Sequence, residues 1–348
     1  MQRVTMLLCM MFILFLSACS IGEETISEEK GQPVAKSNDV EVILKDIQYV
    51  LLDNDRDFHE DNEEQTIKVT IDVRNNMDET SEFYPDMNMI LTNEDGEIIE
   101  ATSPYKLPSG IDIAEFSQNP SLNSEEEKFF HALFNVKKDA SYELEVTLPP
   151  ANKVKIPFDL TEYEMKMDDI TEPELAMETY LEQVVLGNEE TTEDVIDVNL
   201  ENELIEAYDV FAEKMKKVIF YDVSEETIEA LFEEYVPYVQ ENSVIDVNVI
   251  TNTNAQAIVE IDYAALDHRK MLETVLKQEK IFDGLSEEEF VEKVVEILPT
   301  TFEELEVKEA KEPMKITLEK KMSKWYIPER ELEKKERLLR AFFAGGIY

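Results

Sequence analysis

The chain has 348 residues, of which 79 are acidic and 33 are basic, so its formal net charge is −46. A chain this acidic does not offer the clustered lysines and arginines that phosphate contacts with nucleic acid require, and an anionic membrane surface would repel it. With 43% hydrophobic residues it can bury ordinary cores, and its length suits two domains. These features argue against nucleic acid as a partner.

Residues 1–18 have the layout of a secretory signal peptide. One positive charge, Arg3, precedes an apolar run from Met6 to Leu16, and the small residues Ser17 and Ala18 follow it. The apolar run of about eleven residues is too short to cross a bilayer, since crossing takes roughly 20 residues. We therefore expect removal of this segment during export; the alternative is a short helix that stays in the membrane.

The stretch Leu16-Ser17-Ala18-Cys19 resembles a bacterial lipobox, the motif in which the cysteine receives a diacylglycerol and becomes the mature N-terminus. The resemblance implies that Cys19 binds the protein to membrane lipid on the extracytoplasmic face of the cell membrane. Two acyl chains hold a protein for long times, whereas one chain binds only reversibly. Because the other cysteine, Cys9, leaves with the signal peptide, we expect no disulfide.

Residues 19–38 follow as the lipidated cysteine and a flexible tether. Residues 20–38 lack apolar periodicity and are rich in Glu, Ser, Gly and Pro, a composition that cannot bury enough surface to order itself. A flexible chain of this length has a root-mean-square reach of about 24 Å. We expect it to hold the folded part of the protein clear of the lipid headgroups.

Residues 39–162 have the hydrophobic period of two that is typical of β-strands. Ile and Val alternate with polar residues at 67–73, and Asp95-Gly96 lies between apolar flanks, which is a hairpin signal. Six or more short strands with no helix between them favour an all-β domain, an antiparallel sandwich.

Several segments of this region resemble the telokin-like, immunoglobulin-fold domain of Gram-positive surface lipoproteins. They are "VTIDVRNNMDE", "LTNEDGEII", "EEKFFHALFNVKKD" and "YELEV". The resemblance is one of pattern and includes no signature motif. It implies an immunoglobulin-like β-sandwich in which the alternating Ile and Val residues form the core, and a role as an accessory or interaction domain.

After a polar connector at residues 161–172 the hydrophobic period becomes helical. Thr171 with Glu174 matches a capping box, so a helix should start there with Pro173 in its first turn. An apolar stripe predicts a second helix from about residue 200 to 220.

Two serines mark the starts of later helices. Ser224 should cap a helix that Pro237 ends or kinks, and Ser286 with Glu289 forms a second capping box. Charged helical stretches are also expected at 265–281 and 329–343.

Strands alternate with these helices near residues 244, 257 and 313–328, which makes residues 170–345 an α+β domain, an antiparallel sheet covered by helices. The ending at Trp325 and Ile327 is similar to that of NTF2-like and related lipoprotein domains. More narrowly, the region resembles an uncharacterised C-terminal lipoprotein domain, and this resemblance implies no known activity.

The acidic segment at residues 53–64 is the candidate metal site. Positions 1, 3, 5, 9 and 12 of a calcium-binding loop are matched by Asp53, Asp55, Asp57, Asp61 and Glu64. Oxygen ligands suit this cation, but position 6 needs Gly for a sharp turn and is Phe58 here. The flanks also predict strands instead of helices, so a solvated hairpin loop is the favoured alternative.

No catalytic residue and no cofactor site is predicted. The three histidines, His59, His131 and His268, have no metal-ligand spacing, and we expect each to be at the surface or half-buried. Asp267 beside His268 forms no dyad, because the side chains of adjacent residues diverge. The chain also lacks GxSxG, Walker and Rossmann spacings.

Two features have an alternative functional interpretation. Residues 308–340 hold 11 basic and 7 acidic side chains, which could touch lipid headgroups or an acidic wall polymer, although packing against acidic helices of the same domain is favoured. The Tyr, Phe and Met stripe at 204–218 could line an apolar pocket against the sheet, although core packing is the commoner role.

Together these patterns predict a lipid-anchored cell-envelope protein that acts as a non-catalytic interaction or binding module, with an envelope protein or a small ligand as partner. The alternative is a carrier or sensor of a small apolar ligand or Ca²⁺ at the membrane surface. An envelope enzyme would need converging polar groups that the sequence does not show.

Overall fold

The structure, a computed structural model, describes residues 25–29, 32–52, 64–138, 140–150, 152–163, 167–188, 194–281 and 284–346. These residues divide into two compact units, with the division near residue 165 and with Leu51, Leu52 and Pro108–Ile111 grouped with the second unit.

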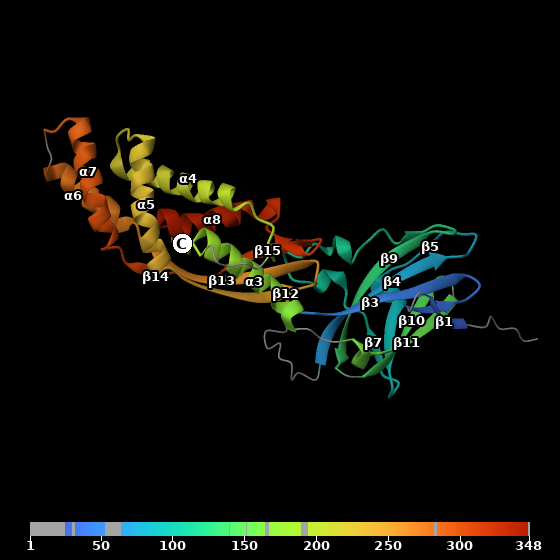
Figure 1. The fold of residues 1–348 in the computed structure, drawn as a ribbon. Helices are drawn as coiled ribbons and strands as arrows, with labels where there is room; N and C mark the ends of the chain where they lie inside the picture. The colour runs from blue at the N-terminus through green and yellow to red at the C-terminus, as the bar shows by residue number, and fades with distance from the viewer. Residues whose placement is uncertain are drawn as a thin grey trace, which may run out of the picture. The chain divides into compact units, whose positions relative to one another are not determined.

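The first unit is built mainly from two antiparallel sheets (Figure 1). One sheet contains, in spatial order, β1 (Thr25–Glu29), β2 (Gln32–Lys36), β3 (Val40–Val50), β4 (Glu64–Asn75) and β9 (Glu127–Lys137). The other contains β11 (Asn152–Asp159), β10 (Ser141–Leu148), β6 (Met89–Asn93) and β7 (Ile98–Glu100). Smaller elements are the pair β5 (Ser81–Glu82) and β8 (Ser121–Leu122), and the single turn α2 (Pro85–Asn88).

Strand β4 forms the centre of this unit. The alternating Ile and Val residues at 67–73 are all fully buried, as their pattern predicts. In a half-exposed strand the polar residues between them would face solvent. Here Lys68 and Asp72 are buried as well. Each is matched by a partner of opposite charge: Glu115 lies 3.1 Å from Lys68, and Lys45 lies 2.9 Å from Asp72.

The expected hairpin at Asp95-Gly96 connects β6 to β7. Gly96 has φ +79°, the left-handed conformation that favours glycine, and its N–H donates to the carbonyl of Asn93 at 3.0 Å. The predicted antiparallel β-structure is therefore confirmed.

The second unit combines an antiparallel sheet with helices, and Figure 1 shows α3, α4 and α8 on one side of that sheet. The strand order is β12 (Val244–Asn252), β13 (Gln256–Leu266), β15 (Met314–Lys321) and β16 (Lys324–Tyr326), and β14 (Val307–Glu309) also pairs with β13. The helices are α3 (Met167–Val184), α4 (Leu200–Ile219), α5 (Glu225–Asn242), α6 (Arg269–Ile281), α7 (Glu287–Phe302) and α8 (Leu332–Ala344). Within the described ranges, none of the helices is long and apolar enough to cross a membrane.

The start of α3 corrects one prediction. The helix begins at Met167, so Thr171 is not its N-cap and Pro173 lies inside the helix. Proline has no N–H, so the carbonyl four residues earlier, that of Asp169, loses its helical partner. The buried side chain of Asn252 supplies the missing donor. Its Nδ2 donates to the carbonyls of Asp169 at 3.1 Å and Ile170 at 2.9 Å. A residue on a distant strand thus allows the helix to start earlier.

The other helix signals are mostly confirmed. Ser224 caps α5, and Ser286 and Glu289 form the predicted capping box of α7. Of the two alternatives at Pro237, an end or a kink, the end is wrong, since α5 continues through Pro237 to Asn242.

The basic C-terminal segment packs against acidic helix α4, as the favoured alternative predicted. Lys335 of α8 is 5% exposed, and its Nζ lies 2.9 Å from the carboxylate of Glu203 and 2.7 Å from that of Glu206. Arg340, near the end of α8, pairs with Glu213 at 2.7 Å. These ion pairs fix one side of α8 to α4.

Candidate functional site

Most of the predicted site residues lie outside the described residues. These are Cys19, Asp53, Asp55, Asp57 and Asp61. Glu64, the last of the calcium-loop positions, is the exposed first residue of β4 and stands opposite Lys137 in the sheet. Among the described residues, no group of three or more histidine, cysteine or carboxylate side chains is placed to hold a metal ion. Lipidation and calcium binding therefore stay predictions.

His131 and His268 occupy different environments, while His59 lies outside the described part of the chain. His131 is half-buried, as expected; its Nδ1 lies 3.0 Å from Thr70 Oγ1, and burial lowers its pKa. His268 differs from the expectation because it is fully buried, with Nε2 at 2.5 Å from the hydroxyl of Tyr235.

The Tyr235–His268 pair is a structural contact. The Tyr235 hydroxyl donates to the carbonyl of Phe342 at 2.9 Å, so Nε2 of His268 carries the proton that it donates to the Tyr235 oxygen. Burial, and then the charge of Lys214, lowers the pKa of His268 to about 3, so the ring is neutral at pH 7. Asp267 turns away to Arg269, with Nη2 at 2.7 Å, which agrees with the expectation that Asp267 and His268 form no dyad.

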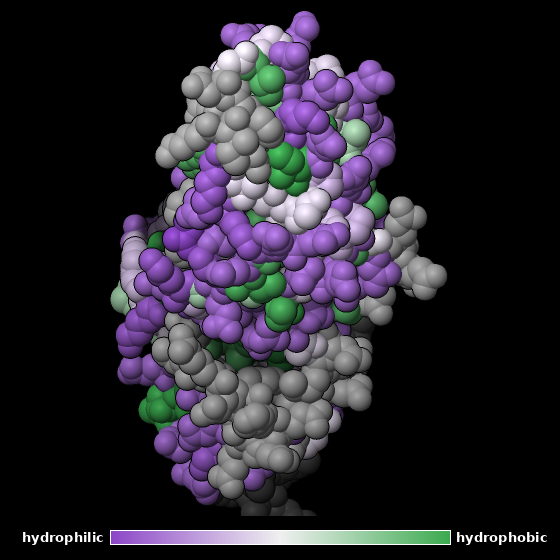
Figure 2. Space-filling view, turned by 90° about the vertical axis from the view of Figure 1, so that its left-hand side faces the viewer, coloured by the Kyte–Doolittle hydropathy of each residue, from purple (hydrophilic) through white to green (hydrophobic). Residues whose placement is uncertain are grey.

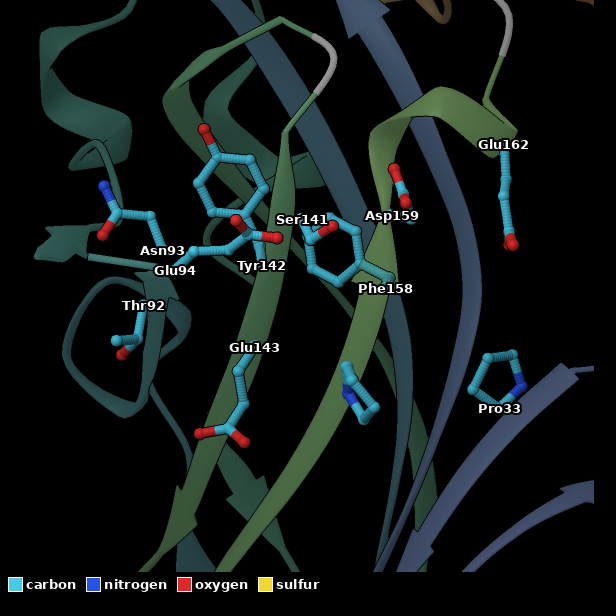
Figure 3. A pocket seen from close by; sticks show the side chains of 11 residues that line it. Pro33, Thr92, Asn93, Glu94, Ser141, Tyr142, Glu143, Phe158, Asp159 and Glu162 are labelled. Atoms are coloured by element: carbon cyan, nitrogen blue, oxygen red, sulfur yellow. The ribbon is translucent and has the colours of Figure 1, made fainter. Parts of the chain in front are cut away.

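A hollow of about 690 Å³ lies beside β10 and β11 in the first unit (Figure 3). Such a volume falls within the range of small-ligand pockets. Tyr142 on β10 and Phe158 on β11 form its floor, because the antiparallel register places these two residues opposite each other. Pro33 and Pro157 add apolar surface at its sides.

The floor of this hollow is held rigidly. The rings of Tyr142 and Phe158 stack with centroids 5.9 Å apart and an interplanar angle of 30°. The Tyr142 hydroxyl accepts from the N–H of Lys137 at 2.8 Å and donates to its carbonyl at 3.1 Å. Burial raises the pKa of Tyr142, so this hydroxyl stays protonated and keeps both bonds.

Carboxylates surround the aromatic floor, as Figure 3 shows for Glu94, Glu143, Asp159 and Glu162. The carboxylate of Asp159 accepts two hydrogen bonds from Thr161, one from its N–H at 2.9 Å and one from its hydroxyl at 2.8 Å. These bonds lower the pKa of Asp159. Lys155 lies 2.5 Å from Glu143 and offsets one of the four charges. An apolar floor with an anionic rim suits a ligand that carries a positive charge next to an apolar group.

The stripe at residues 204–218 divides between core and surface. Phe211 and Met215 are fully buried in the core of the second unit, so this part of the stripe has the commoner role of core packing. The N-terminal part, with Leu204 and Tyr208, instead lines a surface groove of about 570 Å³ against Phe232 of α5. Figure 2 shows the end of this unit where α5, α6 and α7 lie: the surface in view is mostly hydrophilic, with several separate hydrophobic patches.

Comparisons with known proteins bear on the family and on the fold. The family described as "Domain of unknown function (DUF5105)" matches residues 163–343. A crystal structure from Bacillus subtilis, described as a "putative lipoprotein (ycdA)", is 18% identical with a TM-score of 0.55, and the match covers 92% of this chain and 99% of that one. It supports the fold alone.

Two smaller matches have TM-scores too low to support an argument. A "putative lipoprotein" from Staphylococcus aureus is 11% identical with a TM-score of 0.29, covering 41% of this chain and 98% of that one. An uncharacterised β-sandwich protein from Clostridium difficile is 14% identical with a TM-score of 0.21, covering 39% and 89%. Among curated proteins, none matches the chain.

Proposed function

The chain belongs to the DUF5105 family, whose function is unknown, and from this premise we propose that it is a lipid-anchored, extracytoplasmic binding protein without catalytic activity. The lipobox-like stretch that ends at Cys19 supports the anchor. The description of the Bacillus subtilis structure, which shares the fold, as a "putative lipoprotein" agrees with it. In this proposal the mature protein begins at Cys19 and its two units stand outside the membrane.

The same proposal assigns the two units to finer fold classes. The first is an immunoglobulin-like sandwich of the telokin-like kind, supported by its two antiparallel sheets. The second is an α+β domain of NTF2-like or similar architecture, supported by helices α3, α4 and α8 beside an antiparallel sheet.

The hollow over Tyr142 and Phe158 is the observation on which the binding role rests. It joins a rigid aromatic floor to a rim of carboxylates, in a chain whose net charge of −46 attracts cations over long distances. The ligand class that fits is a peptide that presents lysine side chains next to apolar ones. The apolar groups would cover the floor, and the ammonium groups would meet Glu94, Asp159 and Glu162.

The environment of the buried titratable groups supports a non-catalytic role. The Tyr235–His268 pair is fully buried, so a substrate does not reach it. Burial raises the pKa of Tyr235 well above its usual range and lowers that of His268, and both groups are therefore neutral at pH 7.

Titration of the full chain with a fluorescent Lys-Leu-Lys-Leu peptide tests the binding role. The double variant Glu94→Gln/Glu162→Gln should weaken binding several-fold, because it removes two rim charges and keeps the shape of the hollow. Glu100→Gln together with Glu79→Gln is the matched control, since both positions are exposed in the first unit and do not line the hollow. Equal weakening by both pairs, no saturation, or cleavage of the peptide would contradict the proposal.

A second candidate function is favoured by the groove between α4 and α5. Leu204 and Ile205 are 42% and 53% exposed there, which is unusual for large apolar residues side by side. Because glutamates also line the groove, the probe should be uncharged: dodecanol should stabilise such a carrier, since a ligand that binds only the folded state raises the melting temperature. The variant Ile205→Glu should abolish this shift, and an unchanged melting temperature in the parent chain would rule out the carrier role for this ligand.

A further inference from the structure

A cleft of about 530 Å³ in the second unit is lined mainly by basic residues, although the chain as a whole is strongly acidic. It lies where four segments meet: the C-terminal end of α4, the start of α6, the strand β14 with the loop after it, and the C-terminal end of α8. Its basic side chains are Lys214, Lys217, Arg269, Lys308, Lys311 and Arg340. Two carboxylates, Asp267 and Glu309, also line it.

Four of these six cations are held by carboxylates. Asp267 contacts both Arg269, at 2.7 Å, and Lys308. Burial alone would raise the pKa of Asp267, but hydrogen bonds from Arg269 and Lys308 outweigh it and hold the pKa well below its usual range. Glu213, which does not itself line the cleft, contacts Lys217 at 2.6 Å and Arg340 at 2.7 Å, and these bonds lower its pKa to about 2. The carboxylates fix the positions of the four basic groups.

The other two cations, Lys214 and Lys311, have no ion pair or hydrogen bond with any part of the chain that the structure describes. Lys311 is exposed, but Lys214 is half-buried. Burial, and then the charge of Lys217, lowers the pKa of Lys214, so its ammonium is less stable here than in water. The charge of Asp267 offsets this effect only in part, so an anionic ligand in the cleft would stabilise the ammonium of Lys214 further.

The imidazole of His268 lies behind this cleft, between the two lining residues Asp267 and Arg269 in the sequence. Its Nδ1 is buried and has no hydrogen-bond partner within the described residues. The ring is in electrostatic contact with Lys214. His268 is fully buried and does not line the cleft, so Lys214, and not the imidazole, is the group there that a ligand can reach.

From this arrangement we propose that the cleft binds a phosphate group, with Lys214 and Lys311 as direct ligands and with Arg269 and Arg340 contributing their remaining N–H donors. A phosphate offers several anionic oxygens to converging donors, and arginine and lysine are the side chains that recognise it. The volume exceeds that of a phosphate ion, so the ligand is a phosphate ester such as a glycerol phosphate unit. This site is independent of the first-unit hollow, which takes a ligand of opposite charge.

Calorimetric titration of the full chain with glycerol phosphate tests the site. Lys214→Gln should weaken binding about tenfold or more, as expected for loss of a hydrogen bond to a charged group. Lys216→Gln is the matched control, because this exposed lysine is two residues further along α4 and does not line the cleft. Glu309→Gln should tighten binding, since it removes an anion from the wall. If Lys214→Gln does not fold, Lys311→Gln at an exposed position provides the same test.

A second arm distinguishes a free ligand from a lipid headgroup. The full chain with Cys19→Ser, which cannot be lipidated, is sedimented with vesicles of phosphatidylglycerol and, as a control, phosphatidylcholine. Binding to phosphatidylglycerol that glycerol phosphate displaces identifies a headgroup as the source, whereas binding of glycerol phosphate alone identifies a free ester. Absence of saturable binding in both arms would overturn the proposal, and so would equal weakening by Lys214→Gln and Lys216→Gln.

Discussion

The indole Nε1 of Trp325 donates a hydrogen bond to Glu172 Oε2 at 2.9 Å, which connects the last strand of the second unit to its first helix across 153 residues of sequence. Trp325 is fully buried. Lys320, opposite Trp325 on the neighbouring strand β15, contacts the same carboxylate and places its ammonium 5.3 Å from the centroid of the Trp325 ring. One carboxylate therefore satisfies a buried N–H and a lysine.

Replacement of Glu172 should destabilise the protein more than replacement of a neighbouring glutamate. Glu172→Ala leaves the buried N–H of Trp325 without an acceptor, which costs about 2 kcal/mol. Glu178→Ala, on the same helix, should stabilise instead, because burial and then the charges of Glu174 and its neighbours raise the pKa of Glu178 and disfavour its charged form. Urea unfolding of both variants measures the difference. Equal shifts would show that the Trp325 contact contributes nothing.

The buried Lys335 gives a second prediction. Lys335→Met leaves Glu203 and Glu206 without their cation, and breaking a buried ion pair from one side costs about 3–5 kcal/mol. Lys293 of α7 pairs with Glu296 where both side chains are exposed, so Lys293→Met should lower the free energy of unfolding far less. Thermal and urea unfolding should rank the two variants in this order, and the reverse order would contradict the burial argument.

The pH dependence of stability should contain a contribution from His268. Burial holds its folded pKa at about 3, below the usual 6.5 of an unfolded histidine. Between these values the unfolded chain binds the extra proton, so this contribution is complete above pH 6.5 and is lost as the pH falls towards 3. The slope is at most about 1.4 kcal/mol per pH unit.

The variant His268→Gln isolates this contribution from that of the carboxylates. Glutamine can still donate to Tyr235 but does not titrate, so the free energy of unfolding should fall less steeply from pH 6.5 to pH 4 than in the parent chain. Urea unfolding at several pH values measures both slopes. Identical slopes would mean that His268 is not buried as a neutral ring.

The capping box of α7 gives a fourth prediction. The Ser286 hydroxyl accepts from the N–H of Glu289 at 3.3 Å, and the Glu289 carboxylate accepts from the N–H of Ser286 at 2.9 Å. Ser286→Ala should lower the free energy of unfolding by about 1 kcal/mol. Thr171→Ala should lower it by less, because Thr171 is not the N-cap of α3. Chemical unfolding of the two variants measures both losses of stability. An equal or larger loss for Thr171→Ala would contradict the assignment of Ser286 as the cap.

The comparison of Ser286 with Thr171 shows which parts of the fold the sequence predicts. Local signals are sufficient where the partners are near in sequence, as in the α7 capping box and the Gly96 turn. They fail at α3, because Asn252 supplies the hydrogen bonds that let the helix start before Pro173. That donor lies on a strand more than 80 residues away, and no local pattern indicates it.

The candidate sites were harder to predict than the fold for the same reason. Tyr142 and Phe158 form one floor only through the register between β10 and β11, and in the sequence each is simply an inward-facing strand residue. Lys214 belongs to an acidic region of the sequence, and all of its basic neighbours except Lys217 come from three other segments. The sequence indicated an excess of basic residues at 308–340, but not the cleft that some of them line.

The anchor is the central claim of this account, since it determines the compartment and the ligands that both units can meet. Mass spectrometry of the N-terminal peptide, from protein isolated from its native membrane, tests it most directly. The account predicts a peptide that starts at Cys19 and carries the added mass of a diacylglycerol on its sulfur. An unmodified Cys19, or a chain that still begins with residues 1–18, would contradict it.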